Sequence, residues 1–305
     1  MGEVTELALL VSGGRGQLGS DLATLGVRTG TVSAPGSAEL DITDEPAVRA
    51  AVAELADTAR STGRLPVLVN AAAYTAVDAA ETDEDTAYRV NAEGPGLLAR
   101  VSAEFAVPMI HVSTDYVFDG TGQRPYEPDD PTGPQGAYGR TKLAGERAVL
   151  AASDRAWVVR TAWVYGAAGA NFVKTMAKLE TQRDQLSVVD DQRGSPTWSA
   201  DLATGLLDLA TAIAEGRAPE RRVLHRTGAG DTTWFGLARA VFEELGADPE
   251  RVRPCTTADF PRPAPRPAYS VLSAKAWQDA GLVDALPWRA ALHTFFAEHR
   301  ESIAG

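Results

Sequence analysis

Cysteine is almost absent from this sequence, since Cys255 is the single one among 305 residues. One cysteine excludes an intramolecular disulfide, a CxxC redox pair and a zinc site built from thiolates. Long hydrophobic runs are missing too: the apolar stretch near the amino terminus, residues 7–11, is far shorter than the roughly 20 residues of a membrane helix. We therefore expect a cytoplasmic protein that has no membrane partner.

Positive charge is scarce as well. The chain has 29 Lys and Arg residues against 41 Asp and Glu residues, which gives a net charge of −12. Nucleic-acid binders usually carry a basic excess, because the phosphates they neutralise supply much of their affinity, so no nucleic-acid partner is expected. Hydrophobic residues make up 44% of the chain, which is enough for a core at this length and excludes a disordered protein.

Short apolar runs alternate with longer segments of helical spacing. Five runs have the length of strands: residues 7–11, 67–70, 108–113, 157–161 and 186–189. Helical segments such as residues 46–60 and 92–105 lie between them, and Asp44 stands where the N-cap of the former is expected. Strands that alternate with helices form βαβ crossovers, so we predict an α/β fold with a doubly wound parallel sheet of the Rossmann type.

The strand and helix pattern weakens after about residue 190, which predicts a second lobe. We expect a dinucleotide-binding Rossmann-type domain over residues 1–165 and a smaller, mainly substrate-binding lobe over residues 166–305, from which some segments return to the first domain. Residues 253–267 contain five prolines, so they are predicted to be a loop laid over the second lobe. The acidic run at residues 81–85 is predicted to be a solvated face at a helix start.

A glycine-rich loop follows the first predicted strand. The segment VSGGRGQLG (residues 11–19) fits GxGxxG as Gly14, Gly16 and Gly19, and GxxGxxG as Gly13, Gly16 and Gly19. Such glycines give a tight turn and let backbone N–H groups approach a pyrophosphate at a helix N-terminus. An ordinary glycine-rich turn is the alternative, but the order of strand, loop and helix favours dinucleotide binding.

The choice of cofactor depends on the end of the second strand. NAD-specific sites usually place Asp or Glu there, whereas this chain has PGSA at residues 35–38, and Glu39 and Asp41 lie beyond the predicted strand end. Arg15 in the glycine loop could pair with a 2′-phosphate, although a solvent-facing loop charge explains it nearly as well. We therefore expect NADPH, with NADH as the alternative.

Three further residues form a candidate catalytic set. Tyr138 and Lys142 are four positions apart, which places them on one face of a helix, and Thr114 ends an apolar strand. A Tyr hydroxyl can protonate a carbonyl oxygen at neutral pH if a nearby positive charge lowers its pKa from about 10. Lys142 would supply that charge and Thr114 would bind the same oxygen. A surface pair on a helix is the alternative for Tyr138 and Lys142.

This order of motifs resembles the extended short-chain dehydrogenase/reductases. More narrowly, four segments resemble the dTDP-4-dehydrorhamnose reductase family: NAAAYTAVD at 70–78, VSTDYVFDG at 112–120, YGRTKLAGE at 138–146 and RTAWVY at 160–165. The resemblance implies reduction of the C4 ketone of dTDP-4-dehydro-L-rhamnose to dTDP-L-rhamnose, the final step of dTDP-rhamnose biosynthesis, with Thr114, Tyr138 and Lys142 as catalytic residues.

The same resemblance implies further site residues. The residues implied for the cofactor are Gly13, Gly16, Gln17, Leu18 and Gly19 at the pyrophosphate, Asp41 and Ile42 at the adenine end, and Ala71, Ala72, Ala73, Tyr138 and Lys142 at the nicotinamide side. Those implied for the sugar are Thr75, Val77, Asp115, Tyr116 and Trp163. Arg262 and Arg266 would lie over the sugar diphosphate. They belong to residues 251–270, a segment with a local charge of +3 because it holds four arginines and one acidic residue, Asp259.

Metal binding and assembly are less defined by the sequence. Some members of the resembled family bind Mg²⁺ at a dimer interface, but no motif here transfers that ion, so no metal residue is predicted and a homodimer is the assembly that the resemblance allows. The four histidines lack HExxH spacing, and His111, in an apolar strand, is expected to be a packed core residue.

The sequence favours reduction over dehydration, and it leaves two other functions open. A dehydratase of the same superfamily typically has Asp and then Glu after the strand-end Thr, whereas this chain has Asp115 and then Tyr116, which favours simple reduction. A 4-ketoreductase acting on another dTDP-4-keto-deoxysugar in antibiotic sugar assembly would use the same residues. A non-catalytic nucleotide-binding regulatory subunit, resembling the β subunit of methionine adenosyltransferase, would share the fold but not need the catalytic set.

Overall fold

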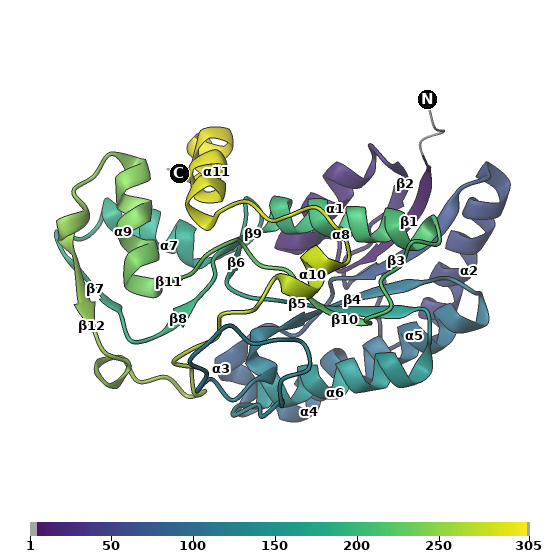
Figure 1. Cartoon of the computed structure of the whole chain (residues 1–305), viewed down its shortest axis with the longest axis horizontal. Coiled ribbons are helices and arrows are strands. Elements are labelled where there is room, and N and C mark those ends of the chain that lie inside the picture. The colour runs from purple at the N-terminus through teal and green to yellow at the C-terminus, as the bar shows by residue number, and fades with distance from the viewer. Residues whose placement is uncertain (1–4, 304–305) are drawn as a thin grey trace.

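A parallel sheet of six strands lies at the centre of the larger lobe in the computed structural model, which describes residues 5–303 (Figure 1). Its strand order is β10-β5-β4-β3-β1-β2. The strands are β1 (Leu7–Ser12), β2 (Gly30–Ser33), β3 (Leu65–Asn70), β4 (Met109–Thr114), β5 (Ala156–Thr161) and β10 (Val223–His225). The predicted doubly wound α/β fold is confirmed, and four of the five predicted strands belong to this sheet.

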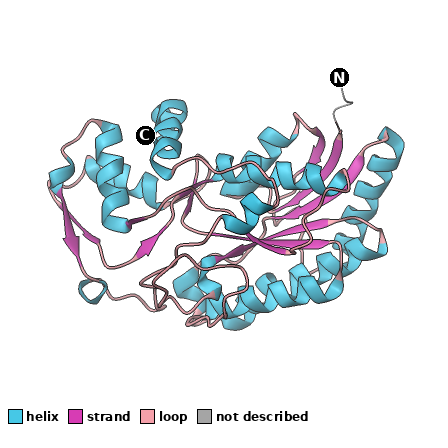
Figure 2. Ribbon diagram, in the orientation of Figure 1, coloured by secondary structure: helices cyan, strands magenta, loops and turns pink. Residues whose placement is uncertain are grey.

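Helices cover both faces of the sheet (Figure 2). One face carries α1 (Gln17–Gly26), α8 (Ser199–Ala214) and α10 (Lys275–Asp279), and the other carries α2 (Glu45–Thr62), α5 (Gly94–Glu104) and α6 (Ala137–Ala152). Successive strand side chains point to opposite faces, so Leu9 packs with α1 and α8 while Leu10 packs with α2. This two-sided burial explains why the strands are continuous apolar runs.

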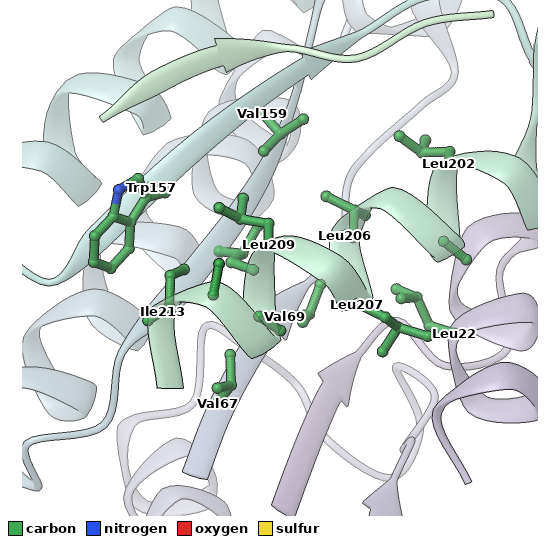
Figure 3. Packing of buried hydrophobic residues seen from close by; sticks show 14 of the residues in the cluster. Leu22, Val67, Val69, Trp157, Val159, Leu202, Leu206, Leu207, Leu209 and Ile213 are labelled. Atoms are coloured by element: carbon green, nitrogen blue, oxygen red, sulfur yellow. The ribbon is translucent and has the colours of Figure 1, made fainter. Parts of the chain in front are cut away.

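Helix α8 and strand β10 come from the second half of the chain but complete the first-half sheet. Strand β10 pairs with β5 in parallel register. Figure 3 shows the α8 side chains against β3 and β5 in one buried cluster, whose labelled members include Val67, Val69, Trp157, Val159, Leu202, Leu206, Leu209 and Ile213. The core of the sheet therefore depends on residues beyond 166.

The second lobe has its own apolar core, built around three helices and short two-stranded ribbons (Figure 1). Its helices are α7 (Phe172–Glu180), α9 (Trp234–Leu245) and α11 (Trp288–Ile303). Its ribbons pair β6 (Val164–Tyr165) with β9 (Thr197–Trp198), β7 (Leu186–Val189) with β12 (Val252–Cys255), and β8 (Arg193–Gly194) with β11 (Thr232–Thr233). The predicted strand at 186–189 is thus β7, outside the main sheet.

Short elements between β3 and α6 shape the rim of the sheet. They are α3 (Val77–Ala80), α4 (Glu84–Tyr88), a π-helical turn (Arg89–Glu93) and a 3₁₀ turn (Asp115–Val117). The predicted helix at 92–105 therefore begins with a π turn, a feature that often occurs at functional sites. Two further 3₁₀ turns, Pro249–Arg251 and Thr257–Asp259, flank β12. Asp44 does occupy the N-cap position of α2, although its side chain makes no capping hydrogen bond.

The Pro-rich segment, predicted to be a loop over the second lobe, differs from that prediction in two respects. Residues 252–255 form β12, where Pro254 is tolerated because a two-stranded ribbon leaves one edge of each strand unpaired. The end of the Pro-rich segment lies against α3 rather than over the second lobe, since the Ala264 N–H donates to Asp78 at 3.2 Å.

The acidic run at 81–85 is not merely a solvated face. Asp83 caps α4, and Glu81 accepts a 2.8 Å hydrogen bond from the Ala137 N–H at the start of α6. Glu84 forms an ion pair with Arg140 of α6 at 2.7 Å. These carboxylates therefore fasten α6, the helix that carries Tyr138, to the α3–α4 segment. Within residues 5–303, no helix has the length and hydrophobicity needed to cross a membrane.

Candidate active site

One cleft of about 880 Å³ opens at the carboxyl ends of the sheet strands, the edge where α/β sheets bind ligands. Its lining contains every residue predicted for the catalytic, cofactor and sugar contacts except the two loop arginines: Gly13, Arg15, Gly16, Gln17, Leu18, Gly19, Asp41, Ile42, Ala71, Ala72, Ala73, Thr75, Val77, Thr114, Asp115, Tyr116, Tyr138, Lys142 and Trp163. The fold thus brings segments from residue 13 to residue 163 into one cavity.

The glycine loop is closed so tightly that side chains would not fit. A Cβ on Gly13, whose φ is +77°, would lie 2.7 Å from the Ala72 nitrogen, and one on Gly19 would lie 2.1 Å from the Gly13 oxygen. Gly14 is equally crowded, because its Cβ would meet the Ala34 oxygen at 2.1 Å. Gly16 is the N-cap of α1. The start of α1 therefore opens into the cleft with a cradle that suits a diphosphate.

Arg15, in the glycine loop, has an acidic partner. Its guanidinium lies 3.2 Å from Glu39, and both side chains are largely exposed. The other Glu39 oxygen accepts a 2.7 Å hydrogen bond from the Gly36 N–H. These contacts, the backbone N–H first, lower the pKa of the Glu39 carboxyl. Glu39, which lies beyond the end of β2, is thus folded back beside the glycine loop.

The catalytic set comes from the end of β4 and the first turns of α6. The Thr114 hydroxyl donates to Asp115 Oδ1 at 3.0 Å and accepts from the Tyr116 N–H at 3.2 Å. Shielding from water raises the pKa of Tyr138 to about 12, a rise that the hydrogen bond with Thr114 opposes. The phenol therefore keeps its proton at neutral pH.

The Lys142 ammonium is held by a backbone carbonyl of β4. Its Nζ donates to the Val112 carbonyl at 2.7 Å. Burial lowers the pKa of Lys142 to about 8, against an opposing effect of Glu146. The contribution that opposes the rise of the Tyr138 pKa in this structure comes from Thr114, and the effect of Lys142 on that pKa stays a prediction.

Polar residues beneath the cleft hold its floor. Asn70 accepts from the Ser12 hydroxyl at 2.8 Å and from the Ala72 N–H at 3.0 Å, and its amide lies 3.0 Å from His111 Nδ1. His111 is fully buried, and burial together with the Lys142 charge lowers its pKa well below its usual value. The prediction that His111 is a packed core residue is confirmed.

Asp115 lines the cleft, and Asn91, which follows the lining residue Val90, is fully buried. Asn91, in the π turn, accepts from the Tyr74 N–H at 2.8 Å and donates to the Thr141 hydroxyl at 3.1 Å. Sequence reasoning missed Asn91, although its place in an interrupted helix is a signal that could have found it. Burial raises the pKa of Asp115 to about 6, and the nearby hydroxyls of Ser270 and Thr114 oppose that rise.

Trp163 has a strained backbone. Its φ is +49°, a left-handed conformation that costs a bulky residue about 1–3 kcal/mol and persists where the surroundings enforce it. Its ring stacks on Trp234 with a centroid separation of 3.6 Å and an interplanar angle of 10°. Trp234 was not predicted as a site residue, because nothing in the sequence near residue 234 marks it.

The arginines of residues 251–270, the segment predicted to be locally positive, do not form one cluster. Arg266 lies 2.8 Å and Arg262 3.9 Å from Asp78 of α3. Arg251 is instead bound to Glu180, at the end of α7. Neither Arg262 nor Arg266 lines the cleft, but the Arg266 charge is close enough to lower the otherwise raised pKa of Tyr116. A count of charges along the chain could not show which arginines already have acidic partners.

Among the residues that the structure describes, no group of three or more His, Cys, Asp or Glu side chains is placed to hold a metal ion.

The sheet, the glycine loop and the cleft define the class of protein, a Rossmann-type NAD(P)-binding oxidoreductase. A family model described as the RmlD substrate binding domain matches residues 7–301. The chain therefore belongs to the RmlD family of dTDP-4-dehydrorhamnose reductases.

Similar proteins cover nearly the whole chain. The dTDP-4-dehydrorhamnose reductase of Mycobacterium tuberculosis (strain ATCC 25618 / H37Rv) is 52% identical over 295 residues, which cover 95% of this chain and 92% of that protein. The enzyme of the same name from Streptomyces griseus is 50% identical over 289 residues, covering 94% and 92%. A crystal structure of dTDP-4-dehydrorhamnose reductase from Bacillus anthracis in complex with NADP has a TM-score of 0.88 at 32% identity, covering 96% of this chain and 99% of that one.

Proposed function

We propose that this chain reduces the C4 ketone of dTDP-4-dehydro-L-rhamnose to the alcohol of dTDP-L-rhamnose, using NADPH. The observation that carries the proposal is the convergence of Thr114, Tyr138 and Lys142 with the glycine loop in a single cleft. The names of the 52% and 50% identical relatives support the substrate, and the NADP complex of the Bacillus anthracis enzyme supports the cofactor.

The residues present fit a dinucleotide. The crowded glycines and the start of α1 form a cradle for the diphosphate. Arg15 would hold the 2′-phosphate in place of Glu39. Asp41 and Ile42 would contact the adenine end, and residues 71–73 would contact the nicotinamide side. When bound, the reduced nicotinamide supplies the hydride to C4 of the sugar.

Tyr138 would donate the proton that the C4 oxygen needs. Its phenol keeps its proton at neutral pH, because burial raises its pKa to about 12. A general acid works best when its pKa lies near the working pH, so this pKa would have to fall in the loaded site. The Thr114 hydroxyl, which donates to Asp115 and accepts from the Tyr116 N–H, would turn its single proton from Asp115 to the same oxygen. Lys142, one helical turn from Tyr138, would bind the nicotinamide ribose and lower that pKa by stabilising the phenolate that forms as the proton leaves.

The sugar nucleotide would occupy the other half of the cleft. Thr75, Val77, Asp115, Tyr116 and Trp163 line that half and would contact the sugar. Arg262 and Arg266 would approach the diphosphate from the Pro-rich segment, where Asp78 fixes them. The residue after Asp115 is Tyr116, whose hydroxyl has a raised pKa, and it cannot replace the carboxylate that a dehydratase uses. This supports reduction without loss of water.

The test is a turnover assay with purified protein, NADPH and dTDP-4-dehydrorhamnose. NADPH oxidation with formation of dTDP-L-rhamnose, identified by NMR, is expected. Tyr138→Phe should lower kcat by about 10²- to 10⁴-fold, the usual contribution of general acid catalysis, while leaving NADPH binding intact. A panel of other dTDP-4-keto sugars runs beside it. No turnover of any keto sugar, or equal turnover by Tyr138→Phe, contradicts the proposal; preference for another sugar in the panel replaces the substrate.

A further inference from the structure

The ring of Trp163 packs against a residue of the second lobe. Trp163 lines the cleft and Trp234 does not, yet the two indoles are stacked at 3.6 Å and nearly parallel. One ring face of Trp163 is therefore covered by Trp234. The backbone of Trp163 is fixed separately, because its carbonyl accepts from the Thr197 N–H at 3.2 Å.

The space beside the Trp163 ring is closed by a glycine. A Cβ on Gly194 of β8 would lie 2.5 Å from Trp163 Cε2. The indole thus contacts a backbone strand as well as a second indole. Together with the strained φ of Trp163, these contacts restrict the position of the ring.

Trp234 is itself well anchored. It is the first residue of α9, whose N-cap Thr233 accepts from the Gly236 N–H at 3.1 Å and donates to Asp190 at 2.6 Å. Phe172, at the start of α7, packs against the Trp234 ring at 4.6 Å. The stack therefore joins the cleft wall to the α7 and α9 core of the second lobe.

We propose that Trp234 is a positioning residue for sugar recognition: it holds the Trp163 indole at the one angle at which that ring closes the sugar half of the cleft. The proposal rests on the proposed function, which gives Trp163 the sugar contact. Parallel stacking with a large overlap restricts both the tilt and the sliding of a ring. Trp234 therefore shapes the sugar half of the cleft without lining it.

The experiment compares Trp234→Ala, Trp234→Phe and Trp288→Ala in the full chain. Trp288 is a matched control, because it is a half-buried tryptophan packed on the same second-lobe core without contact to Trp163. We expect Trp234→Ala to raise KM for the keto sugar about two- to tenfold, the range of an aromatic stack, with KM for NADPH unchanged. Trp234→Phe should restore most of the loss, and Trp288→Ala should leave both KM values unchanged.

A binding readout separates this proposal from the proposed function. In calorimetric titrations, Trp234→Ala should bind dTDP-L-rhamnose more weakly than the wild type but bind dTDP, which lacks the sugar, equally well. Gly194→Ala, whose added methyl would overlap the Trp163 ring, should show the same pattern and serves if Trp234→Ala does not fold. Equal sugar-nucleotide binding by wild type and these variants overturns the positioning role. Absent turnover in the wild type, with the binding difference intact, overturns only the proposed reaction.

Discussion

At the scale of single residues, burial sets the protonation of Lys142, the lysine proposed to act in catalysis. Lys142 is almost fully buried and its pKa is lowered to about 8, below the value of a free lysine, because a charged ammonium is costly in the interior. Between pH 8 and the ordinary lysine pKa, the unfolded chain binds more protons than the folded one. In this window Lys142 therefore makes folding stability rise with pH while the site loses its positive charge.

This predicts a pH limit on cofactor binding. If the Lys142 ammonium binds the nicotinamide ribose, NADPH affinity should be constant below pH 8 and weaken above it, approaching about tenfold per pH unit. Titrations of NADPH by fluorescence from pH 6.5 to 9.5 measure this. In Lys142→Met the affinity should be lower throughout and flat across the range. A wild-type affinity that does not change up to pH 9.5 is incompatible with the role of Lys142.

Residue identities also show how far sequence alone reaches at this scale. Tyr138, Lys142 and Thr114 were found because their spacing and strand position follow from local geometry. Their electrostatics were not, because the Val112 carbonyl that holds Lys142 is brought to it by the packing of α6 on β4. Trp234 was missed for a similar reason: it touches the site only through another side chain.

At the scale of elements, the Pro-rich segment is tied to α3 by charge. Asp78 contacts Arg266 at 2.8 Å and Arg262 at 3.9 Å. An acidic residue beside a diphosphate site would repel the ligand by itself, but with two guanidinium groups the local charge is positive. The sequence showed the arginines and a family likeness, but their partner lies 188 positions away from Arg266, a distance that no local pattern spans.

Arg266→Ala should therefore weaken the binding of dTDP by about tenfold or more, since a charge-assisted hydrogen bond to a phosphate is stronger than a neutral one. Arg253→Ala is the control, because Arg253 is an exposed residue of the same segment located on β12. Calorimetric titration of dTDP measures both variants at one salt concentration. Equal affinities in the two variants would mean that the segment does not reach the diphosphate.

At the scale of the whole molecule, the sheet cannot be completed by the first half of the chain. Leu202, Leu206 and Leu209 of α8 fill the layer over β3 and β5, and β10 covers the edge of β5. A fragment of residues 1–165 lacks both elements. We propose that the two functional halves are real but that neither is an independent folding unit.

The fragment 1–165 should consequently fail to unfold cooperatively, because it exposes one apolar layer of the sheet and the unpaired edge of β5. The measurement is thermal unfolding by near-ultraviolet circular dichroism, with the full chain as control. NADPH should raise the Tm of the full chain, since a ligand that binds only the native state stabilises it, and should have no effect on the fragment. A cooperative, NADPH-sensitive transition in the fragment contradicts this account.

The net charge of −12 is a property of the whole molecule. It describes the surface as a whole and excludes partners that need a basic face. It does not describe the cleft, where Arg15 and Lys142 are the cationic groups of the lining. Exposed carboxylates elsewhere are screened over about 8–10 Å at physiological salt.

The sequence by itself determined the features that depend on neighbours in the chain. Strand and helix periodicity gave the doubly wound fold, the glycines gave the diphosphate cradle, and the four-residue spacing placed Tyr138 and Lys142 on one helix face. The tertiary structure decided the features that depend on packing between distant segments: the Lys142 contact, the Asp78 pairing of Arg266, and the Trp234 stack behind Trp163. The periodicity of a segment determines which of its faces is buried. Only the tertiary structure determines which residues that face contacts, because they come from distant segments of the chain.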